Sequence, residues 1–146
     1  MKMANTIEGK TAAEWFKEAT NYIRLDEYPK AIECLEKTLQ IDPKFKQAWY
    51  VMGSLYDFLK NPPKMIECCE KAVQIDPQFK EAWFELGVAY NDLTNFPKAI
   101  ECWERAVQID PHYKGAWYNL GVTYKRFGDT QKADACFRKA DPIPPY

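Results

Sequence analysis

The chain has 146 residues and a net charge of −1, from 20 Lys and Arg against 21 Asp and Glu, and 47% of its residues are hydrophobic. This composition is typical of one well-packed domain, and the balanced charge argues against a protein that binds nucleic acid by neutralising phosphates. The chain has no apolar run long enough to cross a membrane, its start MKMANTIEGK lacks the apolar stretch of a secretory signal, and its single histidine, His112, excludes a metal site built on paired histidines.

In chain order, the pattern predicts an N-terminal arm, four helical repeats that make up one domain over 12–140, and a Pro-rich tail. Their expected ranges are 1–11, 12–45, 46–79, 80–113, 114–140 and 141–146. The basis is a period of 34 residues, which is the sequence signature of a repeat architecture. Four rows of residues keep this period: Trp15, Trp49, Trp83 and Trp117; Tyr22, Tyr56, Tyr90 and Tyr124; Ala19, Gly53, Gly87 and Gly121; and Pro43, Pro77, Pro111 and Pro145.

Each repeat is predicted to be two antiparallel helices. Over residues 46–60, Trp49, Met52 and Tyr56 recur at intervals of three and four residues, which places them on one face of a helix. A short turn containing proline follows, and a second helix then ends before an Asp-Pro pair because the residue that precedes proline is pushed out of helical geometry.

The segment Trp83-Phe-Glu-Leu86-Gly87-Val-Ala-Tyr90, followed by Ala99, Trp103 and Pro111, carries a resemblance to a known family. The chain resembles the tetratricopeptide repeat family over residues 12–145. The resemblance implies an all-α fold, a right-handed superhelical solenoid of four stacked helix-turn-helix repeats. It also implies a function in binding other proteins, without indicating which partner is bound.

The two ends of the array carry polar residues where the inner repeats are apolar. In the first repeat this row holds Glu14, Glu18 and Asn21, and in the last repeat Asp134 and Asp141 replace aliphatic residues. Such residues predict a cap at each end and therefore a complete domain. The alternative, that the chain is a piece of a longer array, stays open.

Stacked helix pairs form a curved array whose first helices line the concave side, so we expect the partner to bind there. An aromatic residue in every repeat would provide apolar pockets, although these aromatics could equally be partly buried packing residues. The candidate binding residues are Phe16, Thr20, Arg24, Tyr50, Ser54, Asp57, Phe84, Val88, Asn91, Tyr118, Val122, Lys125 and Arg126.

Charge differs between the last two repeats. Residues 80–113 hold three basic and six acidic side chains, a net of −3, whereas residues 114–146 hold six basic and three acidic side chains, a net of +3. We expect Lys125 and Arg126 to orient a ligand, because complementary charge sets register. An ordinary solvated surface is the alternative.

Some relatives bind the C-terminal carboxylate of heat-shock chaperones through Lys, Arg and Asn side chains. The corresponding positions here hold Phe16, Thr20, Val51, Glu81 and Glu85, which supply no cation. We therefore predict no such carboxylate clamp. Asn119 also has no asparagine in the same row of the other repeats, so no asparagine ladder is expected.

The sequence predicts no enzyme, no catalytic residue and no cofactor. The glycines are separated by whole repeats and cannot form a phosphate-binding loop, and carboxylates such as Glu67 and Glu101 are expected to be solvated. The five cysteines, including the Cys68-Cys69 pair, are expected to be packed free thiols, which indicates a reducing, cytoplasmic setting.

The predicted function is a protein-interaction scaffold that binds a peptide or helix of an unidentified partner in the concave groove. A scaffold that assembles with itself through the tail or the convex face is the alternative, with weak self-association. An RNA-binding helical repeat is opposed by acidic residues such as Glu81 and Asp92 near the groove.

Overall fold

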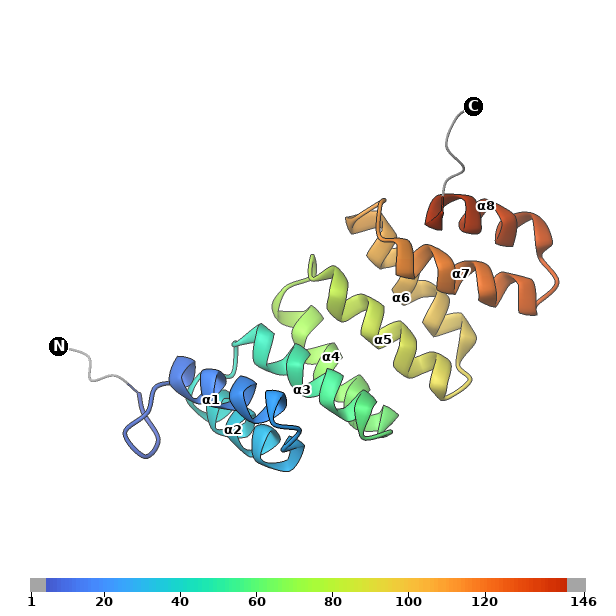
Figure 1. Ribbon diagram of the computed structural model, residues 1–146. Helices are drawn as coiled ribbons and strands as arrows, with labels where there is room; N and C mark the ends of the chain where they lie inside the picture. The colour runs from blue at the N-terminus through green and yellow to red at the C-terminus, as the bar shows by residue number, and fades with distance from the viewer. Residues whose placement is uncertain (1–4, 142–146) are drawn as a thin grey trace. The chain divides into compact units, whose positions relative to one another are not determined.

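The computed structural model describes residues 5–141, and residues 1–4 and 142–146, which include most of the Pro-rich tail, lie outside the described part (Figure 1). The described residues form eight α-helices that follow one another in pairs. Their bounds are α1 (Ala12–Arg24), α2 (Tyr28–Ile41), α3 (Lys46–Phe58), α4 (Pro62–Ile75), α5 (Lys80–Asp92), α6 (Phe96–Ile109), α7 (Lys114–Arg126) and α8 (Thr130–Ala140).

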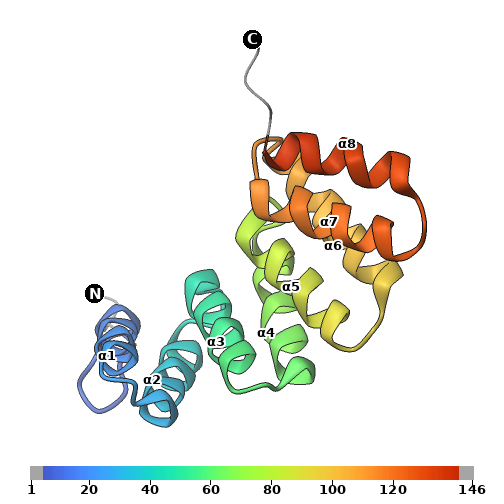
Figure 2. The same cartoon turned by 45° about the vertical axis from the view of Figure 1, so that its right-hand side comes forward.

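The helices divide into two compact units, which are described separately. The first unit contains α1 to α4 and the second contains α5 to α8. Within each unit every odd-numbered helix packs against the helix that follows it, and the two pairs meet through α2 and α3 or through α6 and α7 (Figure 2). The all-α helix-turn-helix repeats expected from the 34-residue period are confirmed.

The repeated glycines allow the two helices of a pair to approach closely. A Cβ atom at Gly87 would lie 2.4 Å from Nε1 of Trp103, and one at Gly121 would lie 2.7 Å from the ring of Phe137. The indole of Trp103 is 2% exposed and donates a hydrogen bond of 3.2 Å to the carbonyl of Phe84. Gly87 therefore provides the space that the large Trp103 side chain needs.

The turn between the two helices of each repeat requires one residue with positive φ. This residue is Asp26, Lys60, Thr94 or Gly128, with φ of 57°, 57°, 58° and 80° in turn. Only glycine adopts this region without steric cost, and a β-branched residue such as Thr94 is the least suited to it. Three of the four repeats thus contain a strained turn.

The tryptophan of each repeat is anchored by its indole N–H. Nε1 of Trp49, Trp83 and Trp117 donates to the carbonyl six residues earlier, which belongs to a proline in the turn that precedes the repeat, at 2.9, 2.9 and 2.8 Å. Each bond holds the start of a first helix to the end of the preceding repeat. A residue before the first repeat must supply this acceptor for Trp15.

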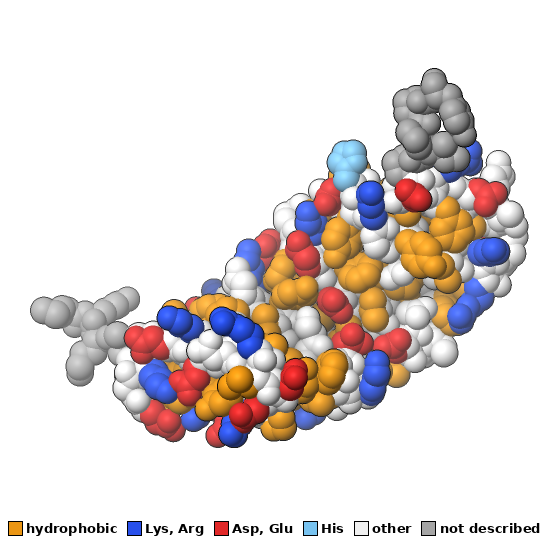
Figure 3. All heavy atoms as spheres, in the orientation of Figure 1, with side chains coloured by type: hydrophobic (Ala, Val, Ile, Leu, Met, Phe, Trp, Pro, Cys, Tyr) orange, Lys and Arg blue, Asp and Glu red, His pale blue; other side chains and the backbone are white. Residues whose placement is uncertain are grey.

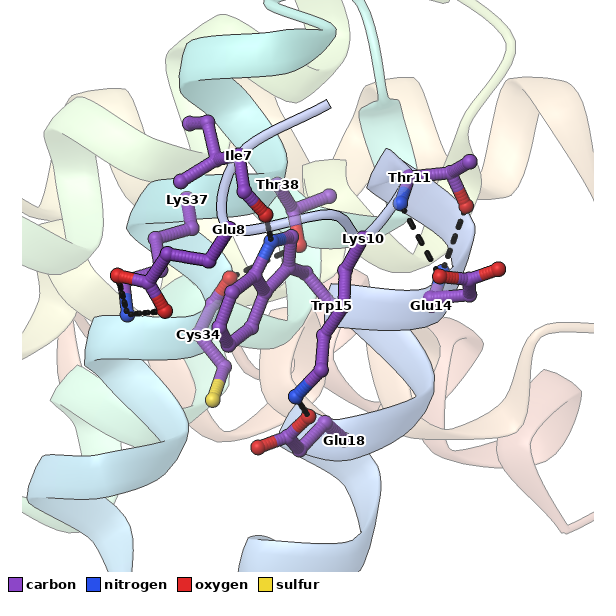
Figure 4. Close-up of polar contacts among 10 residues, drawn as sticks. All are labelled: Ile7, Glu8, Lys10, Thr11, Glu14, Trp15, Glu18, Cys34, Lys37 and Thr38. Carbon is purple, nitrogen blue, oxygen red and sulfur yellow. Dashed lines mark hydrogen bonds and ion pairs between the residues drawn. The ribbon is translucent and has the colours of Figure 1, made fainter. Parts of the chain in front are cut away.

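The N-terminal arm supplies the missing acceptor. Nε1 of Trp15 donates to the carbonyl of Ile7 at 3.0 Å (Figure 4). Residues 7–10 form a tight turn in which Glu8 and Gly9 have φ of 52° and 76°, and the backbones of Ile7 and Lys10 exchange hydrogen bonds of 3.0 Å. The arm thus takes the place of a preceding repeat, and Trp15 is only 4% exposed.

Ion pairs hold the arm to the first repeat. Lys10 pairs with Glu18, and Glu8 pairs with Lys37 at 3.3 Å. The ammonium groups of Lys10 and Lys37 also lie 4.4 and 4.2 Å from the centre of the Trp15 ring (Figure 4). Glu18, predicted from the sequence as part of a polar cap, is half-buried and is a partner of the arm.

Candidate functional site

The predicted binding residues of the first unit lie on α1 and α3. Several of them make ring contacts or hydrogen bonds within the unit. The ring of Phe16 packs on Phe45 with centroids 4.9 Å apart, and Tyr50 is half-buried. The hydroxyl of Thr20 donates to the carbonyl of Lys17 at 2.7 Å, and Ser54 donates in the same way to Tyr50 at 3.2 Å. These hydroxyls therefore already have acceptors in their own helices.

Arg24 and Asp57 belong to the last turns of α1 and α3. Arg24 is exposed and Asp57 is half-buried.

In the second unit, the aromatics differ in their freedom to meet a ligand. The ring of Phe84 stands edge-on to Tyr113 at 5.3 Å, and a Cβ atom at Gly115 would lie 3.3 Å from it. Tyr118, in contrast, is 56% exposed beside Phe137. Of these two predicted anchors, Tyr118 presents the more accessible ring.

A pocket of about 240 Å³ lies between α5 and α7. Figure 3 shows hydrophobic side chains gathered over these helices. Three of its residues, Val88, Asn91 and Val122, were predicted as binding residues, and the structure brings them together. The complete lining is Val88, Asn91, Trp103, Asn119, Val122 and Thr123.

This pocket holds two carboxamides, of which Asn91 was predicted as a binding residue and Asn119 was not. Asn91 is in the last turns of α5, and Asn119 is in the middle of α7, so they occupy different positions of the 34-residue repeat. Comparison along one row at a time therefore left Asn119 without a partner. A comparison of residues 28 positions apart, which lie on neighbouring first helices, could have found the pair.

The helical spacing of these residues explains why they face the same side. Val88 and Asn91 are three residues apart on α5, and Asn119 and Val122 are three residues apart on α7. In the first unit, the positions two repeats earlier hold Thr20, Ile23, Val51 and Ser54. No carboxamide occupies these four positions.

The predicted cations lie in the last turn of α7. Lys125 and Arg126 are both exposed, and the guanidinium of Arg126 lies 4.9 Å from the centre of the Phe96 ring. Phe96 also packs edge-on against Phe127 at 5.3 Å. Arg126 is thus directed toward Phe96 at the start of α6.

The thiols and carboxylates of the described residues are packed or dispersed. Cys68 is 4% exposed and Cys69 fully buried, and burial, with the nearby charge of Glu67, raises the pKa of the Cys68 thiol to about 12. A thiol that stays protonated at neutral pH is a poor nucleophile. Between residues 5 and 141, no three His, Cys, Asp or Glu side chains are grouped as metal ligands.

No helix within residues 5–141 has the length and apolar character needed to cross a bilayer.

Comparison with known proteins identifies the repeats. Models of the tetratricopeptide repeat match residues 12–45, 46–79, 81–113 and 102–135. No curated protein matches the sequence significantly.

Solved structures share the fold. A crystal structure of MamA is 25% identical with a TM-score of 0.86, and the match covers 91% of this chain and 78% of that one. MamA from Desulfovibrio magneticus RS-1 is also 25% identical, with a TM-score of 0.82 over 91% and 75% of the two chains.

A third structure, at lower identity, is similar in fold alone. The first tetratricopeptide domain of Spaghetti (RPAP3), solved with the HSP90 peptide SRMEEVD, is 22% identical with a TM-score of 0.78, and the match covers 85% of this chain and 98% of that one. Together with the repeat models, the paired helices show that the chain belongs to the tetratricopeptide repeat family.

Proposed function

We propose that this protein binds an extended peptide segment of a partner protein on its second unit. The binding face is the one formed by α5 and α7, the first helices of the two repeats. The observation that carries the proposal is the pocket in which Asn91 and Asn119 lie beside Val88 and Val122. A carboxamide offers both a donor and an acceptor, as a peptide bond does, so two carboxamides can pair with a peptide backbone. The valines and the exposed ring of Tyr118 provide contacts for apolar side chains.

The chemistry of this face favours an internal peptide segment over a C-terminal carboxylate. At the positions where some relatives hold the carboxylate, this chain has no cation, and two of these positions hold Glu81 and Glu85. Carboxylates at these positions would repel a bound carboxylate. The HSP90 peptide of the Spaghetti structure is therefore not the type of ligand that we propose for this chain.

Selection of short random peptides on the full chain, followed by affinity measurements, tests the proposal. We expect Asn91→Ala and Asn119→Ala each to weaken the selected peptides by about fivefold to tenfold, because each leaves a backbone group of the peptide without a partner. Thr20→Ala and Ser54→Ala are matched controls, since these hydroxyls bond their own helices. Equal binding by all four variants would contradict the proposal.

Self-association is a second candidate, favoured by exposed apolar side chains at the turns inside the repeats. The residues that follow the first helices are large and apolar in every repeat, and they are 44–65% exposed: Leu25, Leu59, Leu93 and Phe127. Phe58, adjacent to Leu59, is 62% exposed. A contiguous exposed surface formed by such side chains would be an association site.

Sedimentation velocity over a range of protein concentrations tests self-association. If these side chains form a contact between copies, the variant with Leu25→Ser and Phe58→Ser must remain monomeric at concentrations where the parent associates. Thr20→Ala is the control, because its hydroxyl is bonded within α1. A parent that stays monomeric at every concentration would exclude this second function.

A further inference from the structure

Two pockets at equivalent positions occur in the chain, one in each unit, and neither belongs to the first-helix face discussed above. The pocket of the first unit has a volume of about 440 Å³ and that of the second about 470 Å³. Each residue that lines the second pocket is two repeats after its counterpart in the first. The first is lined by Glu36, Leu39, Gln40, Trp49, Met52, Tyr56, Lys64, Glu67 and Cys68.

In the second pocket, side chains of the same chain already contact the tryptophan ring and the carboxylate. The ammonium of Lys139 lies 4.3 Å from the centre of the Trp117 ring, so the indole has a cation over it. The hydroxyl of Tyr124 donates to Glu104 at 2.9 Å. Where the first pocket has a second carboxylate, Glu67, this pocket has Ala135. This pocket therefore has no unpaired carboxylate to offer a ligand.

The first pocket has the same frame but a different charge. Glu67 occupies the position of Ala135, so two exposed carboxylates, Glu36 and Glu67, line it. Lys64 lies 5.2 Å from the Tyr56 ring, as Lys132 lies 5.3 Å from Tyr124, so this cation is common to both pockets. The two pockets therefore differ in the added carboxylate of Glu67 and in whether a cation lies over the tryptophan ring.

Trp49 has no cation over its ring among the described residues, whereas the tryptophans of the other three repeats do. Lys37 lies over Trp15 at 4.2 Å and Arg105 over Trp83 at 5.9 Å, in addition to Lys139 over Trp117. The residue at the same repeat position as these cations is Lys71, which is exposed. The hydrogen bond from Nε1 of Trp49 to the carbonyl of Pro43 fixes the edge of the indole, and the ring lines the pocket.

We propose that the first pocket binds an arginine side chain of a partner protein. A planar guanidinium stacks on an indole face and donates hydrogen bonds to carboxylates, which a pocket lined by Trp49, Glu36 and Glu67 offers together. The apolar side chains of Leu39 and Met52 are positioned to contact its methylene groups. The occupant would provide from outside the cation that the other three repeats provide themselves.

This site is separate from the proposed peptide-binding face. On α3, Trp49 and Tyr50 are adjacent, so their side chains point about 100° apart around the helix axis. Trp49 lines the pocket between α2, α3 and α4, and the proposed peptide pocket belongs to the second unit. Failure at one site therefore leaves the other unaffected.

An NMR titration of the full chain with two probes tests the proposal. The probes are the blocked tripeptide Gly-Arg-Gly and the same tripeptide with citrulline, the neutral analogue of arginine. We expect the indole N–H resonance of Trp49 to shift saturably with the arginine probe, and that of Trp117 not to shift. A shift of Trp49 that is equal with citrulline, or no shift at all, would overturn the proposal.

Variants of exposed residues sharpen the test without disturbing the core. Glu67→Ala removes one carboxylate and is expected to weaken the arginine probe by about twofold to fivefold, as for an exposed ion pair. The pair Ala135→Glu and Lys139→Ala makes the second pocket like the first, so Trp117 should acquire the response of Trp49. Unchanged affinity in Glu67→Ala, together with a silent Trp117 in the double variant, would show that these differences do not create a site.

Discussion

At the scale of single residues, the pairing of Gly87 with Trp103 gives the most direct stability prediction. We expect Gly87→Ala to destabilise the second unit by about 1–3 kcal/mol, because the new methyl group would overlap a buried indole that has little space to move. Gly115→Ala is the control, since its Cβ would meet only the edge of Phe84 at 3.3 Å. Urea unfolding curves in which both variants match the parent would refute this packing account.

The strained turn at Thr94 predicts a stabilising substitution. Thr94→Gly should raise the free energy of unfolding by up to about 1 kcal/mol, because glycine adopts φ of 58° without the clash between Cβ and backbone. The reciprocal change Gly128→Thr, at the same position of the next repeat, should lower it by a similar amount. Thermal unfolding of both variants measures the effect, and a destabilised Thr94→Gly would contradict it.

Burial of the Cys68 thiol predicts a loss of stability at alkaline pH. The thiol has a pKa of about 12 in the folded protein and 9.0 as its ordinary value, so above pH 9 the unfolded chain releases this proton first. The contribution of this thiol to the free energy of unfolding is therefore fully present below about pH 8, and it is lost as the pH rises from 9 to 12. Urea unfolding under reducing conditions at pH 8 and 10 should show a drop that is about 1 kcal/mol smaller in Cys68→Ala than in the parent. Equal drops would contradict this assignment.

At the scale of elements, the N-terminal arm acts as a substitute for a preceding repeat. Gly9 has φ of 76° and no atom within 4 Å of its Cβ position, so Gly9→Ala strains the turn without a steric contact. We expect this variant to release the arm and to accelerate hydrogen exchange at the indole of Trp15, but not at that of Trp49. Gly128→Ala, with φ of 80° in the second unit, is the control. Unchanged exchange at Trp15 would show that the arm does not hold it.

The helices were predictable because their packing repeats, and contacts that do not repeat were not. The rows of tryptophan, tyrosine and glycine identified every helix pair, since each row occupies one position of the repeat. The bond from Trp15 to Ile7 was not predictable, because its acceptor is a backbone carbonyl that any residue carries. Asn119 was not predicted as a binding residue, because it lines the same pocket as Asn91 from a different position of the neighbouring repeat.

The candidate binding residues show the same limit. The sequence placed Phe84 and Tyr118 in one row, and the repeat that follows makes them different. Phe84 packs edge-on against Tyr113 at the end of its own repeat and lies beside Gly115 of the next repeat, whereas Tyr118 packs against Phe137 within its own repeat and remains 56% exposed. Exposure therefore depends on the position of a repeat in the array as well as on its sequence.

At the scale of the whole molecule, the proposed function requires the second unit to bind the backbone of an extended peptide through Asn91 and Asn119. A double-mutant cycle measures this directly. In a selected peptide, each backbone amide in turn is replaced by an ester, which removes one N–H donor and keeps the shape, and its affinity is measured for the parent and for Asn119→Ala. We predict one position at which the two changes are coupled by about 1 kcal/mol, so that an ester that weakens binding to the parent about fivefold has almost no effect on the variant. Losses that simply add at every position would contradict the claim.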